Sequence, residues 1–372
     1  MRSVIILGAG CSLAEAQSYR PKRPKEHPPL DAGFFEKAQS LARDHEGVRT
    51  RVAALRDGIA RSGLFYDPFS PVAAPMEQFF ADVYYEVASA RSRPAFEVFI
   101  ELLRLYAAIL AETTNWMSKQ SRTGALGRFL RGEIERAGTD RLTLITFNQD
   151  LVIENAIQRL YRRPGVWCLQ ALYGDIGAIP VSYGPRSVIP AFEHHHPGCL
   201  HLAPVRLLKL HGSLNWGLRT TTPNPRAATI FPADLRRSVF LLNTRTVIAL
   251  PAIRTRAVGR KGRERWYWWP LVVPPIYEKQ RVTGIDLLQG LWTQAREAIE
   301  QAERVTLVGY SLPDADIGGK QMLRRAFATN TALDGVDCVN PDAGMTPKIV
   351  HTLGCKAVRL YSDLDSYARL AR

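Results

Sequence analysis

Five short apolar segments, each followed directly by small or polar residues, constrain the fold of this chain more than any other feature. The segments are rich in Val, Ile and Leu, and helical patterns separate them. A strand that is apolar on both faces is typical of a parallel sheet covered by helices on each side. The sequence therefore predicts an α/β fold with a Rossmann-like, mostly parallel sheet and helices on both faces. The endings of the segments are GAGCS (8–12), FNQD (147–150), HGS (211–213), GYSLPDAD (309–316) and NPD (340–342).

These endings predict one binding crevice, because ligands of open α/β sheets bind beside the carboxyl ends of the strands. In the first ending, Gly8 and Gly10 fit a turn that brings backbone N–H groups close to a phosphate. A dinucleotide fingerprint would place a third glycine at position 13, where this chain has Leu13. The first turn thus departs from the pattern of hydride-transfer enzymes.

Three polar residues at the strand ends are candidates for catalysis. Asn148 ends an apolar run, so its amide needs a partner. Asp150 has two interpretations: its carboxylate faces the crevice, or it caps a helix that begins at Leu151. His211 follows the apolar run RLLKL, and a histidine in that place can act as a general base on a hydroxyl group.

Two insertions interrupt the predicted sheet domain. Residues 33–138 have apolar residues at helical spacing and predict an inserted helical domain. Residues 217–265 are basic and irregular, with a hairpin predicted over 238–250, and form a smaller second insertion. Residues 1–32 and 139–372 are left for the Rossmann-like domain, which the second insertion interrupts.

The charge of the chain is strongly positive. Lys and Arg exceed Asp and Glu by 49 − 35 = 14, with concentrations at 20–25 and 219–265. Such a balance fits a nucleic acid, an anionic substrate or an acidic protein partner. In the second stretch the arginines adjoin the aromatic residues 266–269, which favours a subunit interface and leaves nucleic acid as the alternative. No apolar run approaches the ~20 residues of a membrane helix, so we expect a cytoplasmic protein without a membrane partner.

Cysteine spacing predicts no zinc ribbon, and one histidine-rich segment leaves a metal site open. The five cysteines form no CxxC pair, which argues against a zinc ribbon and against a disulfide framework. The segment HHHPGCLH (194–201) has two open interpretations, a metal site and a lid over the crevice.

The motifs GAGCS, TFNQD, KLHGSLNW, VGYSLPDAD and VNPD, in this order, resemble the sirtuin-like family. The closest resemblance is to its bacterial branch of NAD-degrading effectors of anti-phage defence. Sirtuins carry a T-x-N-x-D motif and an H-G motif, which Thr146, Asn148, Asp150, His211 and Gly212 match. Sirtuin deacylases also carry two cysteine pairs of a zinc ribbon after the histidine motif, whereas residues 212–337 contain no cysteine. The resemblance therefore implies NAD hydrolysis rather than deacylation.

The resemblance also implies roles for individual residues in cleaving the bond between nicotinamide and ribose. Asn148 would orient the ribose and a water, Asp150 would contact the carboxamide, and His211 would act as the general base. NAD would be the substrate, and no zinc ribbon is expected. The implied NAD-binding residues are Gly8, Ala9, Gly10, Cys11, Ser12, Thr146, Gly212, Ser213, Gly309, Ser311, Asp314 and Asn340.

Further implications of the resemblance concern assembly. Relatives of this size form homo-oligomers under the control of a partner, such as a HerA-type ATPase or a nucleic-acid sensor. An ADP-ribosyltransferase or a protein deacylase would use the same pocket with another acceptor. A non-catalytic subunit that senses nucleotides or binds nucleic acid is the alternative from another functional class.

Overall fold

The computed structural model describes most of the sheet and of the helices around it. Only short pieces of the chain between residues 161 and 285 are included. The described residues are 2–70, 75–90, 92–138, 142–160, 172–174, 179–180, 182–184, 187–189, 205–220, 239–241, 252–258, 262–273, 286–314 and 316–370.

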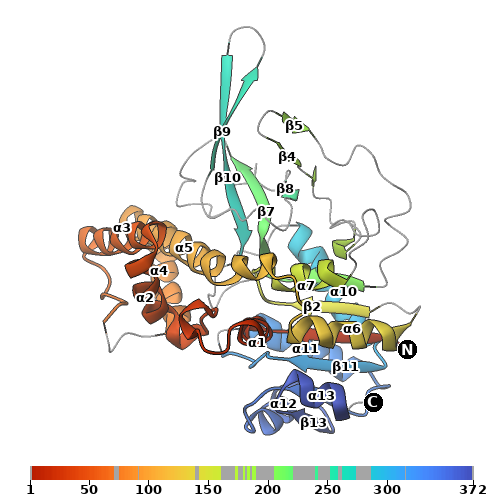
Figure 1. Cartoon of the computed structure of the whole chain (residues 1–372). Coiled ribbons are helices and arrows are strands. Elements are labelled where there is room, and N and C mark those ends of the chain that lie inside the picture. Colours follow the sequence, from red (N-terminus) through yellow and green to blue (C-terminus); the bar gives the residue numbers. More distant parts are fainter. Residues whose placement is uncertain are drawn as a thin grey trace.

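A six-stranded sheet, parallel throughout, forms the centre of the fold (Figure 1). Its order β13-β12-β11-β1-β2-β6 corresponds to 6-5-4-1-2-3 along the chain, which is the doubly wound order. The strand order reverses between β1 and β11. The α/β Rossmann-like prediction is therefore confirmed. The strands are β1 (Ser3–Leu7), β2 (Leu142–Thr146), β6 (Val205–Lys209), β11 (Arg304–Val308), β12 (Val336–Val339) and β13 (Val358–Tyr361).

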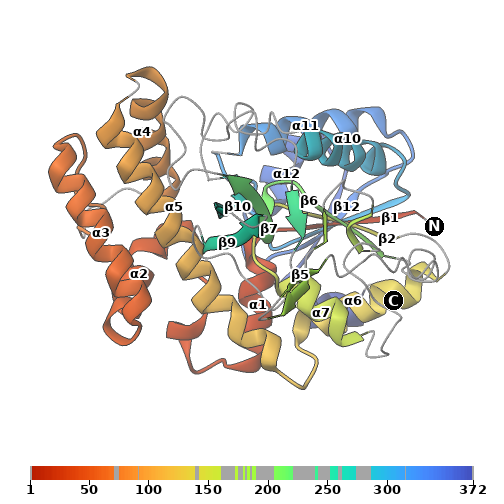
Figure 2. The same cartoon turned by 90° about the horizontal axis from the view of Figure 1, so that it is seen from above.

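Helices cover both faces of this sheet (Figure 2). One layer contains α1 (Ala9–Tyr19), α6 (Ala125–Ala137), α7 (Val152–Leu160) and α13 (Leu364–Leu370). The other contains α10 (Asp286–Glu300), α11 (Ile317–Thr329) and α12 (Met345–Leu353). All five residues of β1 and of β2 are buried, as expected for strands between two helical layers.

The helical insertion lies beside the carboxyl ends of the strands (Figure 1). Its helices are α2 (Phe34–Asp44), α3 (Glu46–Ser62), α4 (Met76–Ser89) and α5 (Arg93–Thr114). The long helix α5 packs against α2, α3 and α4 through an apolar face. Helix α6 also falls within the predicted domain 33–138, but the structure places it on the sheet beside α1 and α7.

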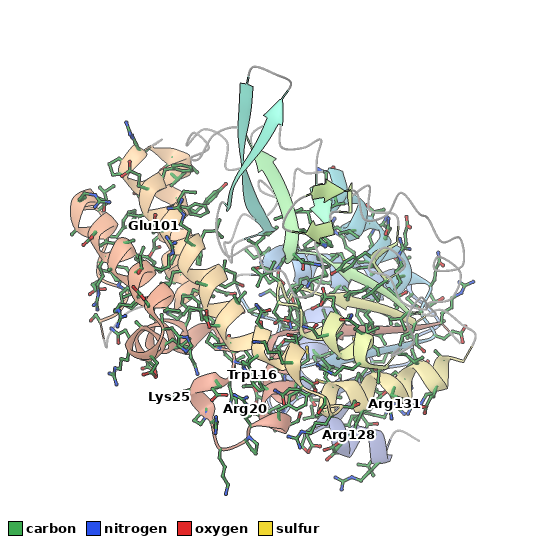
Figure 3. The ribbon with its side chains drawn as sticks, turned by 45° about the horizontal axis from the view of Figure 1, so that its top comes forward. Arg20, Lys25, Glu101, Trp116, Arg128 and Arg131 are labelled. Carbon is green, nitrogen blue, oxygen red and sulfur yellow. The ribbon has the colours of Figure 1, made fainter. Side chains whose placement is uncertain are left out.

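The segment between α1 and α2 is fastened to the end of α5. It contains two short helices, η1 (Pro24–Glu26) and η2 (Asp31–Gly33), and η3 (Asn115–Lys119) follows α5. The guanidinium of Arg20 lies 4.3 Å from the ring centre of Trp116, and Trp116 Nε1 donates to the carbonyl of Glu26 at 3.0 Å (Figure 3). These contacts fix the chain that leads into residues 28–31.

A second sheet stands on the carboxyl end of β6. Its order is β3-β8-β7-β10-β9, and the pair β9–β10 is antiparallel. Of the predicted hairpin 238–250, residues 238 and 242–250 lie outside the described residues, while β8 pairs with β3 and β7. The strands are β3 (Ile179–Pro180), β7 (Gly212–Thr220), β8 (Val239–Leu241), β9 (Ala252–Val258) and β10 (Gly262–Val272); β4 (Ser182–Gly184) and β5 (Ser187–Ile189) form a separate pair.

Candidate functional site

A cavity of about 920 Å³ lies where the order of the main sheet reverses. Its floor consists of the residues that follow β1, β2, β6, β11 and β12, so the five predicted strand endings border one space. Its volume is in the range of small-molecule sites, and its position is the one where doubly wound sheets bind ligands. The helical insertion and the segment before it supply the opposite wall, with Pro29, Asp31, Phe34, Glu77, Tyr106 and Leu110.

The glycine turn after β1 touches the loop after β11. The N–H groups of Gly8 and Gly10 donate to the carbonyls of Val308 and Gly309, both at 2.9 Å. A Cβ atom on Gly8 would lie 2.5 Å from the Cα of Tyr310. The glycines therefore permit close backbone packing across the reversal, and they also place the first turn of α1 on the cavity wall. A helix N-terminus in that place favours an anionic group.

We expect Gly8→Ala to lower the free energy of unfolding by about 2–3 kcal/mol, because the added methyl group overpacks a backbone contact. Urea denaturation measures this change. Gly132→Ala in the interior of α6 is the matched control, since a Cβ there meets nothing within 4 Å. The control should be neutral or stabilising by up to about 1 kcal/mol. Equal stability of the Gly8→Ala and wild-type proteins would contradict the packing role.

A chain of hydrogen bonds joins Asn148, Ser12 and Asp150. Asn148 Nδ2 donates to the carbonyl of Gly8 at 2.9 Å and to Ser12 Oγ at 3.1 Å. Ser12 Oγ donates to Asp150 Oδ2 at 2.8 Å, and the N–H of Val152 donates to Asp150 Oδ1 at 3.0 Å. Asp150 thus caps α7, as one of its two interpretations predicts, and also borders the cavity. Burial raises the pKa of Asp150, although the charge of Lys209 and these hydrogen bonds oppose the rise.

A buried ion pair supports this turn from behind. Lys209, at the end of β6, and Glu154 on α7 are both fully buried, with Nζ and Oε1 2.8 Å apart. Lys209 Nζ also donates to the carbonyl of Asp150, and the Tyr173 hydroxyl donates to Glu154 Oε1 at 2.7 Å. This pair is not among the residues predicted from the sequence. Its signal is a lysine inside the apolar run RLLKL, since a lysine buried there requires a partner.

His211 lies at the bend between β6 and β7, on the cavity wall. Its ring packs edge-on against Phe147, with ring centres 5.1 Å apart, and lies tilted beside Trp292, with ring centres 6.1 Å apart. Its Nε2 is 3.8 Å from Asp316 Oδ1. Asp316 Oδ2 accepts a hydrogen bond from the Tyr310 hydroxyl at 2.7 Å, and burial raises the pKa of that tyrosine well above its usual value.

No protein-family model matches this chain, and no curated protein matches it significantly. Among solved structures, the chain is similar to one described as "Structural Basis for the Mechanism and Regulation of Sir2 Enzymes". The identity is 16%, the TM-score is 0.37, and the match covers 99% of this chain and 89% of the other. Both similarity values are low. The fold class therefore rests on the strand order, and the site rests on the cavity.

Most of the predicted site residues border the cavity, and four do not. Thr146 Oγ1 donates to the carbonyl of Leu7 at 2.9 Å, and buried Ser213 donates to Asn215 Oδ1 at 2.7 Å. Gly212 forms the bend after His211 with φ +76°, and Asp314 is 93% exposed and pairs with Lys320. The predicted residues on the cavity wall are Gly8, Ala9, Gly10, Cys11, Ser12, Asn148, Asp150, His211, Gly309, Ser311 and Asn340.

The wall is acidic, and two of its carboxylates come from residues that the strand endings did not predict. Asp31 and Glu77 come from the segments around α2 and α4, and the N–H of Glu77 donates to Asp31 Oδ1 at 2.9 Å. Burial raises the pKa of Asp31. Asp316 and Asp342 add carboxylates from the sheet side, while none of the described residues that line the cavity is Lys or Arg.

The described residues also bear on the metal, cysteine and membrane predictions. No group of three or more His, Cys, Asp or Glu side chains that could hold a metal ion occurs in the ranges that the structure describes. The segment 194–201 lies outside those ranges. Cys11, Cys338 and Cys355 are buried free thiols. Among the described helices, none has the length and apolar character needed to cross a membrane.

Proposed function

We propose that this chain is an NAD⁺ hydrolase, which converts NAD⁺ and water into nicotinamide, ADP-ribose and a proton. The observation that carries the proposal is the meeting of Asn148 and His211 on one cavity wall, at the ends of the adjacent strands β2 and β6. The N-terminus of α1 borders the same cavity. An amide that can orient a hydroxyl, an imidazole that can take a proton and a helix end that favours an anionic group together suit a reaction on a dinucleotide.

The charge of the cavity fits the two ends of this substrate. The N-terminus of α1 offers the positive end of a helix dipole to the pyrophosphate, while the N–H groups of Gly8 and Gly10 are bonded to the carbonyls of Val308 and Gly309. The carboxylates of Asp31, Glu77 and Asp316 suit the positively charged nicotinamide ring. The motif order that resembles the sirtuin-like family supports the same substrate.

The reaction breaks the C1′–N bond and forms a C1′–O bond with water. The electron pair of the broken bond returns to the nicotinamide nitrogen, and positive charge develops on the ribose as in glycoside cleavage. The acidic wall stabilises this charge. Asn148 Nδ2 is held by Gly8 and Ser12, so its Oδ1 is the atom left to orient a ribose hydroxyl or the attacking water. His211 takes the proton from that hydroxyl or water and releases it to solvent.

Product analysis of the purified protein tests the proposal. We expect NAD⁺ to disappear while nicotinamide and ADP-ribose accumulate in equal amounts, as measured by liquid chromatography. Nicotinamide release with ADP-ribose attached to protein would favour the transferase, and deacylation of an acyl-lysine peptide would favour the deacylase. NAD⁺ that binds without being consumed would contradict an enzymatic function of the chain alone and favour a nucleotide sensor.

The resemblance also implies a wider role, which we include in the proposal. The protein would be a defence effector that depletes cellular NAD under the control of a partner or of homo-oligomer assembly. The same assay, repeated over a range of protein concentrations, measures whether turnover per chain increases with assembly. The basic stretch 219–265 stays a proposed contact for a partner.

A further inference from the structure

We infer that Asp316 is a positioning residue for His211. In this arrangement its carboxylate fixes the orientation of the imidazole and stabilises the ring when it holds a proton. Tyr310 in turn holds the carboxylate. The kinetic part of this inference rests on the proposed hydrolase function, whereas the pairing itself does not.

The geometry brings two distant segments of the chain together. His211 follows β6, and Asp316 precedes α11, yet His211 Nε2 and Asp316 Oδ1 are only 3.8 Å apart. Both side chains are buried, Asp316 with 1% of its surface exposed and His211 with 5%. The hydroxyl of Tyr310 and the N–H of Gly319 donate to the two oxygens of Asp316. The carboxylate is therefore held from two sides while it faces the imidazole.

The rings around His211 leave it little freedom to turn. Phe147 contacts the imidazole edge-on, and Trp292 on α10 lies beside it. Tyr310 stacks on Phe147 with ring centres 4.6 Å apart, so the residue that holds the carboxylate also supports the ring next to the histidine. An imidazole confined in this way keeps one nitrogen directed at Asp316.

The charged groups around His211 are mostly acidic. Asp316 and Tyr310 face it from the loop between β11 and α11, Asp150 borders the same cavity from the turn after β2, and Glu77 does so from α4. The ammonium of Lys209, two residues earlier on β6, forms an ion pair with Glu154. Among the described side chains of α10, the neutral Trp292 contacts the imidazole. A negative surrounding favours the protonated ring, which forms when His211 accepts a proton from water or ribose.

A second role of Asp316 must be separated from this one. Asp316 is the N-cap of α11, because its Oδ1 accepts from the N–H of Gly319 at 3.3 Å. Asp316→Asn keeps an N-cap residue and one acceptor oxygen, so it removes the negative charge together with one of the two hydrogen bonds that the carboxylate accepts from Tyr310 and Gly319. Asp337→Asn is the matched control, since Asp337 is also buried and paired, through Arg359, but does not line the cavity.

The first readout is the NMR titration of the His211 imidazole, identified by the loss of its signals in His211→Ala. We expect Asp316→Asn to lower its titration midpoint by about one pH unit or more, as for removal of a neighbouring charge. Asp337→Asn should leave it unchanged. Tyr310→Phe removes the hydrogen bond that Tyr310 donates to the carboxylate of Asp316, so more negative charge faces the imidazole. This variant should raise the titration midpoint of His211, and it is the second variant if Asp316→Asn does not fold.

The second readout is the pH profile of NAD⁺ turnover. A general base works in its neutral form, so a lower titration midpoint moves the acid limb of kcat towards lower pH. We expect Asp316→Asn to show this shift together with an about 10- to 100-fold lower kcat, since a weaker base transfers the proton more slowly, and a similar KM. Wild-type turnover of zero with a shifted NMR midpoint would overturn the proposed function and support the pairing. An active Asp316→Asn enzyme with the wild-type midpoint and profile would overturn the pairing and leave the function standing.

Discussion

Asn148→Ala is expected to lower kcat/KM for NAD⁺ by about 10²- to 10³-fold, as for the loss of one polar group that acts on the transition state. The amide of Asn148 holds the carbonyl of Gly8 and the hydroxyl of Ser12, and its Oδ1 remains for the substrate. Alanine removes the group that orients the reacting hydroxyl and also loosens the glycine turn. Initial rates of nicotinamide release measure the effect.

The control for Asn148→Ala is Asn330→Ala. Asn330 is also a buried amide, and its Nδ2 donates to the carbonyls of Ile299 at 2.6 Å and Ala302 at 2.8 Å, away from the cavity. Its loss should reduce stability and leave kcat/KM close to that of the wild type. His211→Ala should match Asn148→Ala in loss of rate, because His211 takes the proton from the hydroxyl or water that Asn148 orients. Turnover of Asn148→Ala at the wild-type rate would contradict the assignment of the site.

Lys209→Met is expected to lower the free energy of unfolding by about 3–5 kcal/mol, the effect of leaving one member of a buried ion pair without its partner. Among the described residues, the Tyr173 hydroxyl would then remain as the donor to Glu154 Oε1, and the carbonyl of Asp150 would lose its hydrogen bond from the ammonium. Urea denaturation measures the change.

The double variant Lys209→Met/Glu154→Leu distinguishes the ion pair from simple packing. Replacing both members with apolar side chains removes the uncompensated charge, so most of the lost stability should return. Lys320→Met is the control, because its partner Asp314 is 93% exposed and such surface pairs contribute little. A double variant as unstable as Lys209→Met would show that the uncompensated charge of Glu154 is not the cause.

The sheet could be predicted because each of its buried strands appears in the sequence as a short apolar run. Val4 to Leu7 and Leu142 to Thr146 are buried on both faces, and that burial requires the apolar runs seen in the sequence. Parallel strands present their carboxyl ends at one edge, so the meeting of Asn148 and His211 follows from the strand endings. The sequence alone could not predict that one oxygen of Asp150 caps α7 while the other accepts a hydrogen bond from Ser12, because Ser12 lies on a different element across the crevice.

Other parts of the site depend on contacts that no local pattern records. Asp314 and Asp316 are two positions apart, and only the start of α11 determines that Asp316 is turned inward while Asp314 faces solvent. The helical spacing of α6 resembles that of the insertion, although α6 packs on the sheet. The contributions of Asp31 and Glu77 require the insertion to pack against the strand ends, which its amphipathic pattern does not specify.

The second sheet is attached to the backbone of the site itself. The N–H of Val273, just after β10, donates to the carbonyl of His211, and the N–H of Leu214 on β7 donates to the carbonyl of Gln149, both at 2.9 Å. Strand β7 begins at Gly212, directly after His211, so a displacement of the second sheet would also move the backbone of the proposed base. A shift of about 1 Å in the position of a reacting group costs on the order of 100-fold in rate. A molecule that binds and displaces the second sheet would therefore change the position of His211, and with it the reaction rate, without entering the cavity.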